Sequence, residues 1–269
     1  MLNSEARDEF LNAVQENDVD LVQQHIARGA PVNTIMEDSE TTPLHWAIYN
    51  CYTLCRGPGV LKALLAAPNI NVNVQGYFIY GRQRGTPLHY AVKYNKVECV
   101  RALLAVPGVD VNAKMDDDDL DKFQYNEYAG LNWNPLHEAA NWGRVDIIHA
   151  LLSAPNINVN ESCGSMKWTA LHRAVDNGQL ESVKALLSAP NIDVNSRDWQ
   201  DWTPLHHAVD EEVSDRGDII MALLSSPNID IDSEPPHIRD TLQVTVKSRV
   251  PPAIIALLAV PGVDVNAIL

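Results

Sequence analysis

Nearly the same ten-residue phrase occurs twice in the middle of this chain. LLSAPNINVN occupies residues 151–160, and LLSAPNIDVN occupies residues 186–195. Such a phrase constrains the fold more than any single motif. Self-similarity at a period of about 20–50 residues is typical of arrays in which one small unit stacks on the next. The fold predicted for the chain therefore depends on how often the phrase recurs.

Two phrases recur in register along the chain. The double-leucine phrase begins at Leu64, Leu103, Leu151, Leu186, Leu223 and Leu257. A shorter phrase of the form T-P-L-H-x-A precedes it and places its histidine at His45, His89, His137, His172 and His206. Thr86 and Leu104 are separated by 18 positions, as are Thr169 and Leu187. The spacing is thus fixed inside a unit and varies between units, where loops absorb it.

The interval between the two phrases predicts a pair of helices. In the copy that contains His172 and Leu186, the first helix covers residues 170–175 and stops near Gly178, which suits the left-handed conformation that ends a helix. Val183, Leu186 and Leu187 follow at i, i+3 and i+4 spacing, which is the apolar stripe of a second helix. A helix pair this short cannot bury its own apolar face, so each copy is completed by its neighbours.

These motifs resemble the ankyrin repeat. In that family T-P-L-H-x-A opens the first helix, a leucine-rich second helix follows, and a V-N turn leads to a β-hairpin finger. The family's usual LLxxGADVN is one residue longer here, as LLxxP(N/G)(I/V)xVN, which changes the loop after the second helix. The resemblance covers nearly the whole chain. It implies an all-α repeat solenoid of stacked helix-turn-helix units with β-hairpin fingers.

The whole chain, residues 1–269, is predicted to form a single solenoid of this kind. Its units are expected at residues 4–33, 41–73, 85–112, 133–160, 168–195, 202–232 and 240–266. The first is a capping unit without the T-P-L-H phrase, and polar residues such as Gln23 suit its outward face. The last is apolar to its end. We therefore expect this flank to pack against a partner or a second copy of the chain.

The composition limits the class of partner. The formal net charge is −15 and the pI is near 4.9. Such a field repels phosphate backbones and anionic lipid, so neither nucleic acid nor a membrane surface is expected as a partner, whereas a protein with a basic surface is favoured. The N-terminus lacks the apolar core of a secretory signal. No apolar run reaches the ~18 residues that span a membrane, so a cytoplasmic location is expected.

No motif predicts catalysis, a cofactor or a metal site. The sequence holds no P-loop, no G-x-S-x-G and no H-E-x-x-H. The motif histidines recur at steps of one repeat, about 10 Å apart, which is too far to share one ion; the resemblance implies a local structural hydrogen bond for them. The acidic run from Asp117 is not an EF-hand, because Lys122 and Tyr128 occupy its sixth and twelfth positions. Reduced, inert thiols are expected at the scattered cysteines Cys51, Cys55, Cys99 and Cys163.

Two repeat positions are expected to contact the partner. The resemblance implies that partners bind a concave side, formed by first helices and finger tips, through residues that the stack leaves free. The position before the T-P-L-H phrase holds Trp133, Trp168 and Trp202, with Trp199 and Trp142 close by. The position after the motif histidine holds Trp46, Tyr90, Glu138, Arg173 and His207. Aromatic side chains are enriched at interface centres; alternatively, the tryptophans only stiffen the fingers.

Two long fingers add candidate contacts. Residues 113–132 form an acidic finger insertion that carries Asp116, Asp117, Asp118 and Asp119. It suits a basic partner, or else it is a solvated tip. The finger at residues 74–85 has alternating aromatic residues, among them Tyr77 and Tyr80, as an extended hairpin would. The two fingers belong to adjacent units and are expected to act as one surface.

The sequence thus predicts a module that binds a partner protein through the concave face and the long fingers. The resemblance implies that such a module serves as an adaptor, or as an effector that is translocated into a host cell. The alternative is a structural subunit that self-assembles through the apolar C-terminal flank. Replacing Trp133, Trp168 and Trp202 by alanine separates the two, because a binder loses its partner and a self-assembling subunit keeps its oligomer.

Overall fold

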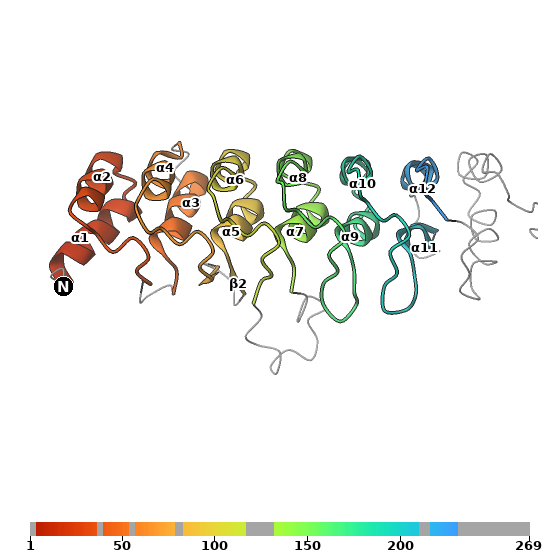
Figure 1. Ribbon diagram of the computed structural model, residues 1–269, viewed down its shortest axis with the longest axis horizontal. Coiled ribbons are helices and arrows are strands. Elements are labelled where there is room, and N and C mark those ends of the chain that lie inside the picture. The colour runs from red at the N-terminus through yellow and green to blue at the C-terminus, as the bar shows by residue number, and fades with distance from the viewer. Residues whose placement is uncertain are drawn as a thin grey trace, which may run out of the picture. The chain divides into compact units, whose positions relative to one another are not determined.

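The computed structural model describes residues 4–36, 40–53, 57–78, 83–116, 132–209 and 216–230. Within these residues the chain forms paired short helices and one two-stranded sheet (Figure 1). The helices are α1 (Ser4–Gln15), α2 (Val19–Ala27), α3 (Pro43–Thr53), α4 (Gly59–Leu65), α5 (Pro87–Lys93), α6 (Val97–Leu104), α7 (Pro135–Asn141), α8 (Val145–Leu152), α9 (Ala170–Asp176), α10 (Leu180–Leu187), α11 (Pro204–Val209) and α12 (Gly217–Leu224). The strands are β1 (Gly76–Tyr77) and β2 (Arg84–Gly85).

Each of the first six predicted units contains one of these helix pairs. The two helices predicted for the fifth unit, residues 168–195, are present as α9 and α10, and Gly178 has the left-handed φ of +66° that was expected where the first helix ends. The last predicted unit, residues 240–266, lies outside the described residues, and so does most of the acidic finger insertion. The expectations for the apolar C-terminal flank therefore remain predictions.

The chain divides into two compact units. We call Met1–Glu138 with Ser153–Ile157 the N-unit, and Ala139–Leu152 with Asn158–Leu269 the C-unit. In the N-unit the first helices α1, α3 and α5 pack in sequence on one another, and the second helices α2, α4 and α6 form a second layer beside them. In the C-unit α9 packs on α11, while α10 packs between α8 and α12.

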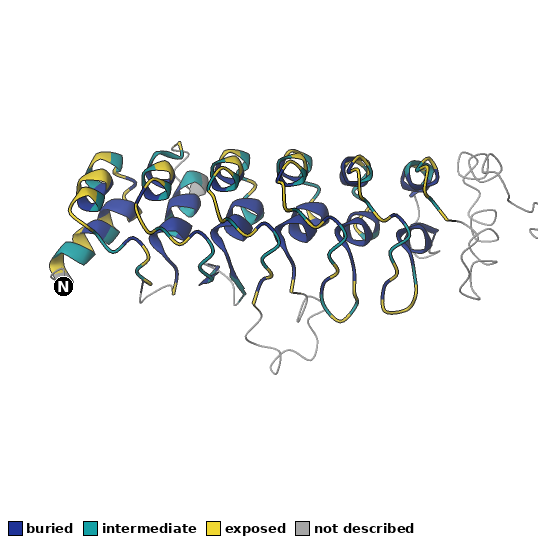
Figure 2. Ribbon diagram, in the orientation of Figure 1, coloured by how far each residue is buried: buried dark blue, intermediate teal, exposed yellow. Residues whose placement is uncertain are grey.

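The core of each unit lies between its two helix layers. The first helices from α3 onward are buried along most of their length, whereas α1 and the second helices bury one side and expose the other (Figure 2). Fully buried leucines such as Leu88 and Leu103 in the N-unit, and Leu171 and Leu186 in the C-unit, fill this layer. Burial of one such side chain stabilises the fold by about 1.5–3 kcal/mol. The repeated letters of the sequence are thus the ones that form the core.

The helices end where the sequence permits a left-handed residue. The turn between the two helices of a pair contains such a residue at Asn17, Asn95, Gly143 and Gly178, with φ between 55° and 66°. Glycine adopts this conformation without a steric penalty, and asparagine tolerates it better than most residues. At Gly143 an added Cβ would also come within 2.3 Å of the Gln179 Oε1 atom, the end of a flexible side chain that would have to shift aside.

A row of asparagines joins successive repeats. In the N-unit, Asn33 donates through Nδ2 to the Asn69 carbonyl at 2.7 Å and accepts at Oδ1 from the Asn71 N–H at 2.8 Å. In the C-unit, Asn160 bonds in the same way to the Asn191 carbonyl and the Asp193 N–H. Further bonds to the turn of the following repeat come from Asn73, Asn112 and Asn195. These are the V-N asparagines, and we call them the asparagine row.

The two long fingers of the N-unit are joined by backbone hydrogen bonds. Strands β1 and β2 pair antiparallel, with Tyr77 opposite Arg84. Arg84 in turn exchanges both backbone hydrogen bonds with Asp116, the first acidic residue of the insertion, at 3.0 and 3.1 Å. The Met115 N–H donates to the Trp133 carbonyl at 2.8 Å across the base of the second finger. The expected adjacency of the two fingers is therefore present in the described residues.

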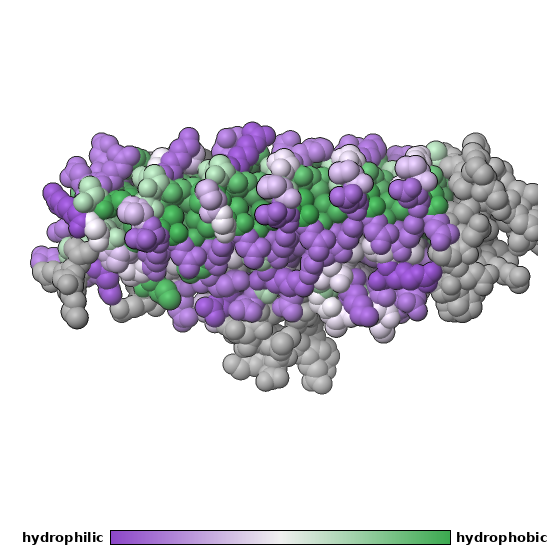
Figure 3. Space-filling model, viewed as in Figure 1, coloured by the Kyte–Doolittle hydropathy of each residue, from purple (hydrophilic) through white to green (hydrophobic). Residues whose placement is uncertain are grey.

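On the face shown in Figure 3, most of the surface over the fingers is hydrophilic. Figure 3 shows hydrophilic side chains over the lower part of each unit, where the fingers lie, and hydrophobic surface at the level of the second helices. Among the described residues, no helix is long and apolar enough to cross a membrane.

Candidate functional site

The motif histidines connect each first helix both to its own cap and to the next repeat. The His45 Nδ1 atom lies 2.9 Å from the Thr42 Oγ1 atom and accepts from the Thr42 N–H at 3.3 Å. Its Nε2 atom lies 3.1 Å from the carbonyl oxygen of Gly85, which can only accept. Nε2 therefore carries the proton, and Nδ1 is the acceptor. The local hydrogen bond predicted for these histidines is present, and the second bond adds a contact between repeats.

The same geometry recurs in both units. In the N-unit His89 contacts Thr86 at 2.9 Å and the Trp133 carbonyl at 3.1 Å. In the C-unit His172 contacts Thr169 at 2.9 Å and the Trp202 carbonyl at 3.2 Å. Both Thr86 and Thr169 belong to capping boxes, which satisfy otherwise unpaired N–H groups at the helix start. The T-P-L-H phrase is thus a helix start that also bonds to the following finger.

Burial keeps these histidines neutral. It lowers the pKa of His45, His89 and His172 from the ordinary value of 6.5 to about 4, although the bond to a backbone carbonyl acts in the opposite direction. A protonated ring could not accept at Nδ1, so protonation would break the cap. The residues are structural in this fold. Among the described residues no group of three or more histidines, cysteines, aspartates or glutamates is placed to hold a metal ion.

In the N-unit, the residue after the motif histidine belongs to an aromatic cluster. The Tyr90 ring stacks on Phe78 at a centroid distance of 4.6 Å and meets the edge of the His45 ring at 4.6 Å. The Tyr90 hydroxyl donates to the Tyr77 carbonyl. The Lys93 Nζ atom lies 3.8 Å from the centroid of the Phe78 ring, a cation–π contact. The finger at residues 74–85 is therefore fixed onto α5 by its own aromatic residues.

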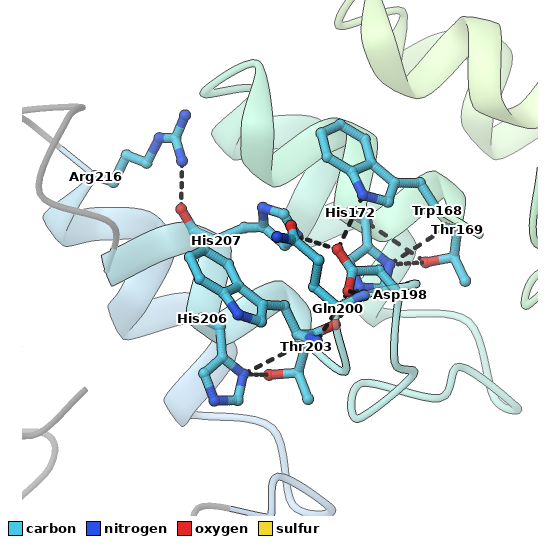
Figure 4. A network of polar contacts seen from close by, with 10 residues as sticks. Trp168, Thr169, His172, Asp198, Gln200, Thr203, His206, His207 and Arg216 are labelled. Carbon is cyan, nitrogen blue, oxygen red and sulfur yellow. Dashed lines mark hydrogen bonds and ion pairs between the residues drawn. The ribbon is translucent and has the colours of Figure 1, made fainter. Parts of the chain in front are cut away.

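In the C-unit, the equivalent residue belongs to a polar network around Asp198 (Figure 4). The Asp198 side chain accepts from the Trp168 Nε1–H at 3.1 Å and contacts the His207 Nε2 atom at 2.9 Å. It also accepts from the backbone N–H groups of Gln200 and Trp202 at 2.8 and 2.9 Å. Asp198 is only 4% exposed, and four donors surround its two oxygens. This network fixes the finger at residues 195–202 onto α11.

The charge of Asp198 is stabilised by these donors. Burial raises the pKa of the carboxyl, but the bonds from the Trp202 N–H, the His207 ring and the Gln200 N–H outweigh it and hold the pKa below its ordinary value of 3.8. Nearby, the buried Arg216 donates to the carbonyls of His207 and Asp176, at the C-terminal ends of α11 and α9. A cation at these helix ends complements the helix dipoles.

Several predicted contact residues are not on the surface. The expectation that the stack leaves the position after the motif histidine free is wrong for Tyr90, Glu138, Arg173 and His207, which are all buried. Trp133 and Trp168, at the position before the T-P-L-H phrase, are buried as well. The physical reason is that each finger folds back onto its first helix, so that the Arg173 guanidinium lies 4.4 Å from the Trp168 ring. That any of these residues contacts a partner stays a prediction.

Other predicted residues do reach the surface. Trp199, at the tip of the finger at residues 195–202, is 57% exposed, and Asp116 is exposed too. Trp46, Tyr77 and Trp202 are partly buried. The remaining predicted contact residues lie outside the described residues: Tyr80, Asp117, Asp118 and Asp119.

Trp142, which the sequence places near the repeated tryptophan position, lies in the turn after α7 and is 59% exposed. One feature was missed by the sequence reasoning. Asp198 was not singled out, because its role depends on a partner nine residues later, His207. The sequence signal that could have found Asp198 is its charge complementarity to His207, the variable residue after the motif histidine.

The comparisons with known proteins agree with this geometry. The family model described as ankyrin repeats (3 copies) matches residues 10–115, 117–198 and 167–235. The solved ankyrin repeat domain of Bcl-3, a unique member of the IkappaB protein family, is similar with a TM-score of 0.70 and 21% identity, over 88% of this chain and 92% of that chain. That likeness bears on the fold alone. A comparison with curated proteins finds no match. The family model covers most of the chain, and the chain belongs to the ankyrin repeat family.

Proposed function

We propose that this chain binds a partner protein through the finger at residues 195–202, with Trp199 as the central contact. Ankyrin repeats generally mediate protein–protein interaction, and the family is a non-enzymatic interaction module. The observation that carries the proposal is the 57% exposure of Trp199 on a finger whose base is buried. Tryptophan is enriched among the residues that dominate binding energy at interfaces.

The finger is held in place before any partner binds. Its base is fixed by the Asp198 network, and the Trp199 N–H donates to the Met166 carbonyl of the neighbouring finger at 3.1 Å. A preorganised contact loses little conformational entropy on association. The exposed indole is therefore presented on a rigid support rather than on a free loop.

Charge supports a partner with a basic surface. The chain carries a net charge of −15, and Asp201, two residues from Trp199, is exposed. Long-range electrostatic attraction between an acidic chain and a basic partner accelerates association and is screened by salt. We propose an adaptor role in the cytoplasm, or in a host cell if the protein is delivered there as an effector.

The test compares two exposed tryptophans. The immobilised full-length chain is used to capture proteins from an extract of the cells that make it, and the captured protein is then purified for a binding measurement. Trp199→Ala should raise the Kd by about 30-fold or more, because it removes a dominant contact worth about 2 kcal/mol. Trp142→Ala is the matched control, because it removes an indole of similar exposure outside the fingers.

Equal binding by the wild type and both variants would reject the finger as the binding site. Loss of binding in both variants would point to general adhesion of exposed indoles. If the partner is basic, raising the salt concentration from 0.05 to about 0.5 M should slow its association, since the Debye length falls well below ~10 Å.

A further inference from the structure

Part of the N-unit is positively charged although the chain as a whole is acidic. The sequence contains 35 aspartates and glutamates, yet none lies between Glu40 and Glu98. Six basic residues occupy the same stretch: Arg56, Lys62, Arg82, Arg84, Lys93 and Lys96. The stretch includes α3, α4, α5 and the finger at residues 74–85. Its charge is therefore opposite in sign to the net charge of −15.

A strip of aromatic rings crosses this stretch. Trp46 and Tyr49 on α3 meet edge to face at a centroid distance of 5.6 Å, and Tyr49 meets Tyr94, directly after α5, at 5.6 Å. Tyr94 contacts Tyr90 at 5.8 Å, and Tyr90 stacks on Phe78. The last two residues are buried, whereas the first three are partly exposed. We call these five residues the aromatic strip.

Two basic side chains contact aromatic rings of the finger at residues 74–85. The Lys93 Nζ atom lies 3.8 Å from the centroid of the Phe78 ring, at the buried end of the strip. The Arg84 guanidinium lies 5.3 Å from the centroid of the Tyr77 ring. Both are cation–π contacts. Since Lys93 and Arg84 are partly exposed, the rings hold these cations beside the strip and within reach of solvent.

A third cation, Lys96, follows Tyr94 by two residues. Its N–H donates to the Ala91 carbonyl at 2.8 Å, which fixes its backbone in the turn between α5 and α6. Lys96 is partly exposed as well. We call the aromatic strip, together with Tyr77, Arg84, Lys93 and Lys96, the basic aromatic surface.

The acidic residues that border this surface come from outside the stretch. Asp116 is exposed and pairs with β2 through its backbone. Glu98 on α6 pairs with Arg101 at 3.3 Å. Burial lowers the pKa of Lys93, and the charge of Glu138 opposes that shift, but Glu138 is itself buried. Because α3, α5 and the finger at residues 74–85 carry no carboxylate side chain, positive charge exceeds negative charge over the described part of the surface.

From this arrangement we propose that the basic aromatic surface binds an acidic peptide segment of a partner protein, one that carries aromatic side chains as well as carboxylates. The carboxylates pair with the ammonium and guanidinium groups. The aromatic side chains pack against the partly exposed rings of Trp46, Tyr49 and Tyr94. The charge of this segment is opposite to that of the partner proposed for the finger at residues 195–202, so the inference does not depend on that function.

The charge of the rest of the chain favours a short acidic segment over a long polyanion. A nucleic acid extends well beyond the surface that it contacts, and a chain of net charge −15 repels its phosphates there. Exposed charges further away than the Debye length, about 10 Å at 0.1 M salt, are largely screened. A short acidic segment therefore responds mainly to the cations that it touches.

The test measures the fluorescence anisotropy of labelled peptides with the full-length protein in about 0.1 M salt. The probe is a short peptide of glutamates and phenylalanines. One control peptide has lysine in place of each glutamate, and a second has alanine in place of each phenylalanine. The probe should bind about tenfold more tightly than either control, because each control lacks one of the two kinds of contact.

Charge reversals on the surface should weaken binding of the probe. Arg84→Glu and Lys96→Glu should each raise the Kd by about fivefold, since each removes a cation and adds a repulsive charge. Lys62→Glu is the matched control, because this exposed residue belongs to the same stretch but lies on α4, in the layer of second helices. It makes the same change in net charge and should keep the Kd within about twofold. Trp199→Ala should bind the probe as the wild type does, which separates this test from that of the proposed function.

Four results would overturn the proposal. Equal losses in Lys62→Glu and Lys96→Glu would show that only the net charge matters. Tighter binding of the lysine peptide, or of a single-stranded oligonucleotide, would assign the surface to a basic partner or to nucleic acid. Salt-sensitive dimerisation of the wild type that Lys96→Glu abolishes would assign it to a second copy of the chain. Circular dichroism shows whether each variant is folded, and the comparison of the three peptides needs only the wild type.

Discussion

Tyr90 in the N-unit and His207 in the C-unit occupy the same repeat position, directly after the motif histidine. Both are buried, but different kinds of contact surround them. Tyr90 packs against Phe78, an apolar ring from the finger before its helix. His207 bonds to Asp198, a carboxylate from the finger before its helix. One contact depends on apolar area, and the other depends on satisfied polar groups.

The comparison shows that the variable residue after the motif histidine is matched by a complementary side chain in a finger. The partner of each residue lies in the finger directly before its helix, and Arg173 follows the same rule with Trp168. A buried polar group is tolerated when it is hydrogen-bonded and is costly when it is not. The stack therefore accepts a tyrosine, an arginine or a histidine at this position if the finger supplies the complementary side chain.

Removal of the Tyr90 ring should give the largest effect. Tyr90 is fully buried, and Tyr90→Ala should lower the free energy of unfolding by about 4 kcal/mol, since it leaves a cavity beside Phe78. Urea unfolding measures the loss, and hydrogen exchange over α5 locates it. Tyr90→Phe keeps the ring stack and removes only the donor to the Tyr77 carbonyl, so its cost should be about 1 kcal/mol. Equal losses in the two variants would show that the stacking contributes little.

Removal of the Asp198 carboxylate should give the next largest effect. Asp198→Ala leaves the donors of Trp168 and His207 and two backbone N–H groups without their acceptor. We expect a loss of about 3 kcal/mol, with faster hydrogen exchange over α11 and the finger at residues 195–202. Gln200→Ala, a change at an exposed neighbour, is the control and should stay within about 0.5 kcal/mol. An unchanged exchange rate over α11 would contradict the role given to the network.

As the pH falls, the stabilisation from the buried histidines should be lost before the stabilisation from Asp198. The pKa values of His45, His89 and His172 are lowered to about 4 in the folded chain, so the unfolded chain binds protons first as the pH falls below 6.5. Their stabilisation is complete above pH 6.5 and is lost between pH 6.5 and 4, at about 1.4 kcal/mol per pH unit for each residue, or about 2 kcal/mol by pH 5. The pKa of Asp198 is lowered below 3.8, so its contribution is lost only at still lower pH.

Urea unfolding at pH 7, 6 and 5 measures this dependence. His89→Gln should be less stable at pH 7, and its stability should fall less steeply with acid, by about 1.4 kcal/mol per pH unit. A slope equal to that of the wild type would mean that His89 is already protonated in the fold.

The exposed finger tip should give the smallest effect. Trp199 is more than half exposed, and Trp199→Ala should change the free energy of unfolding by less than about 0.5 kcal/mol. Thermal unfolding checks this. A large loss would assign Trp199 to the packing of the fingers, and it would weaken its use as a binding probe.

The sequence could predict the positions of the repeats and their helices, but not whether each variable residue is buried or exposed. The T-P-L-H and double-leucine phrases encode helix starts and a core stripe, which are local patterns, so α9 and α10 were predicted closely. Trp133 and Trp202 hold the same repeat position, yet one is buried and the other only partly so. Their exposure depends on which residues of the finger and first helix pack around them, and repeat spacing does not encode that.

The asparagine row explains why the fingers vary in length. From Asn112 the bond to the Asn156 carbonyl is 2.7 Å long, the same as from Asn33 to the Asn69 carbonyl, although the acidic finger insertion intervenes only in the first case. The register of the helices is therefore set at the turns and is uncoupled from the loops that project beyond them. A chain built in this way is a display scaffold, on which a new loop can be grafted without redesign of the layers that support it.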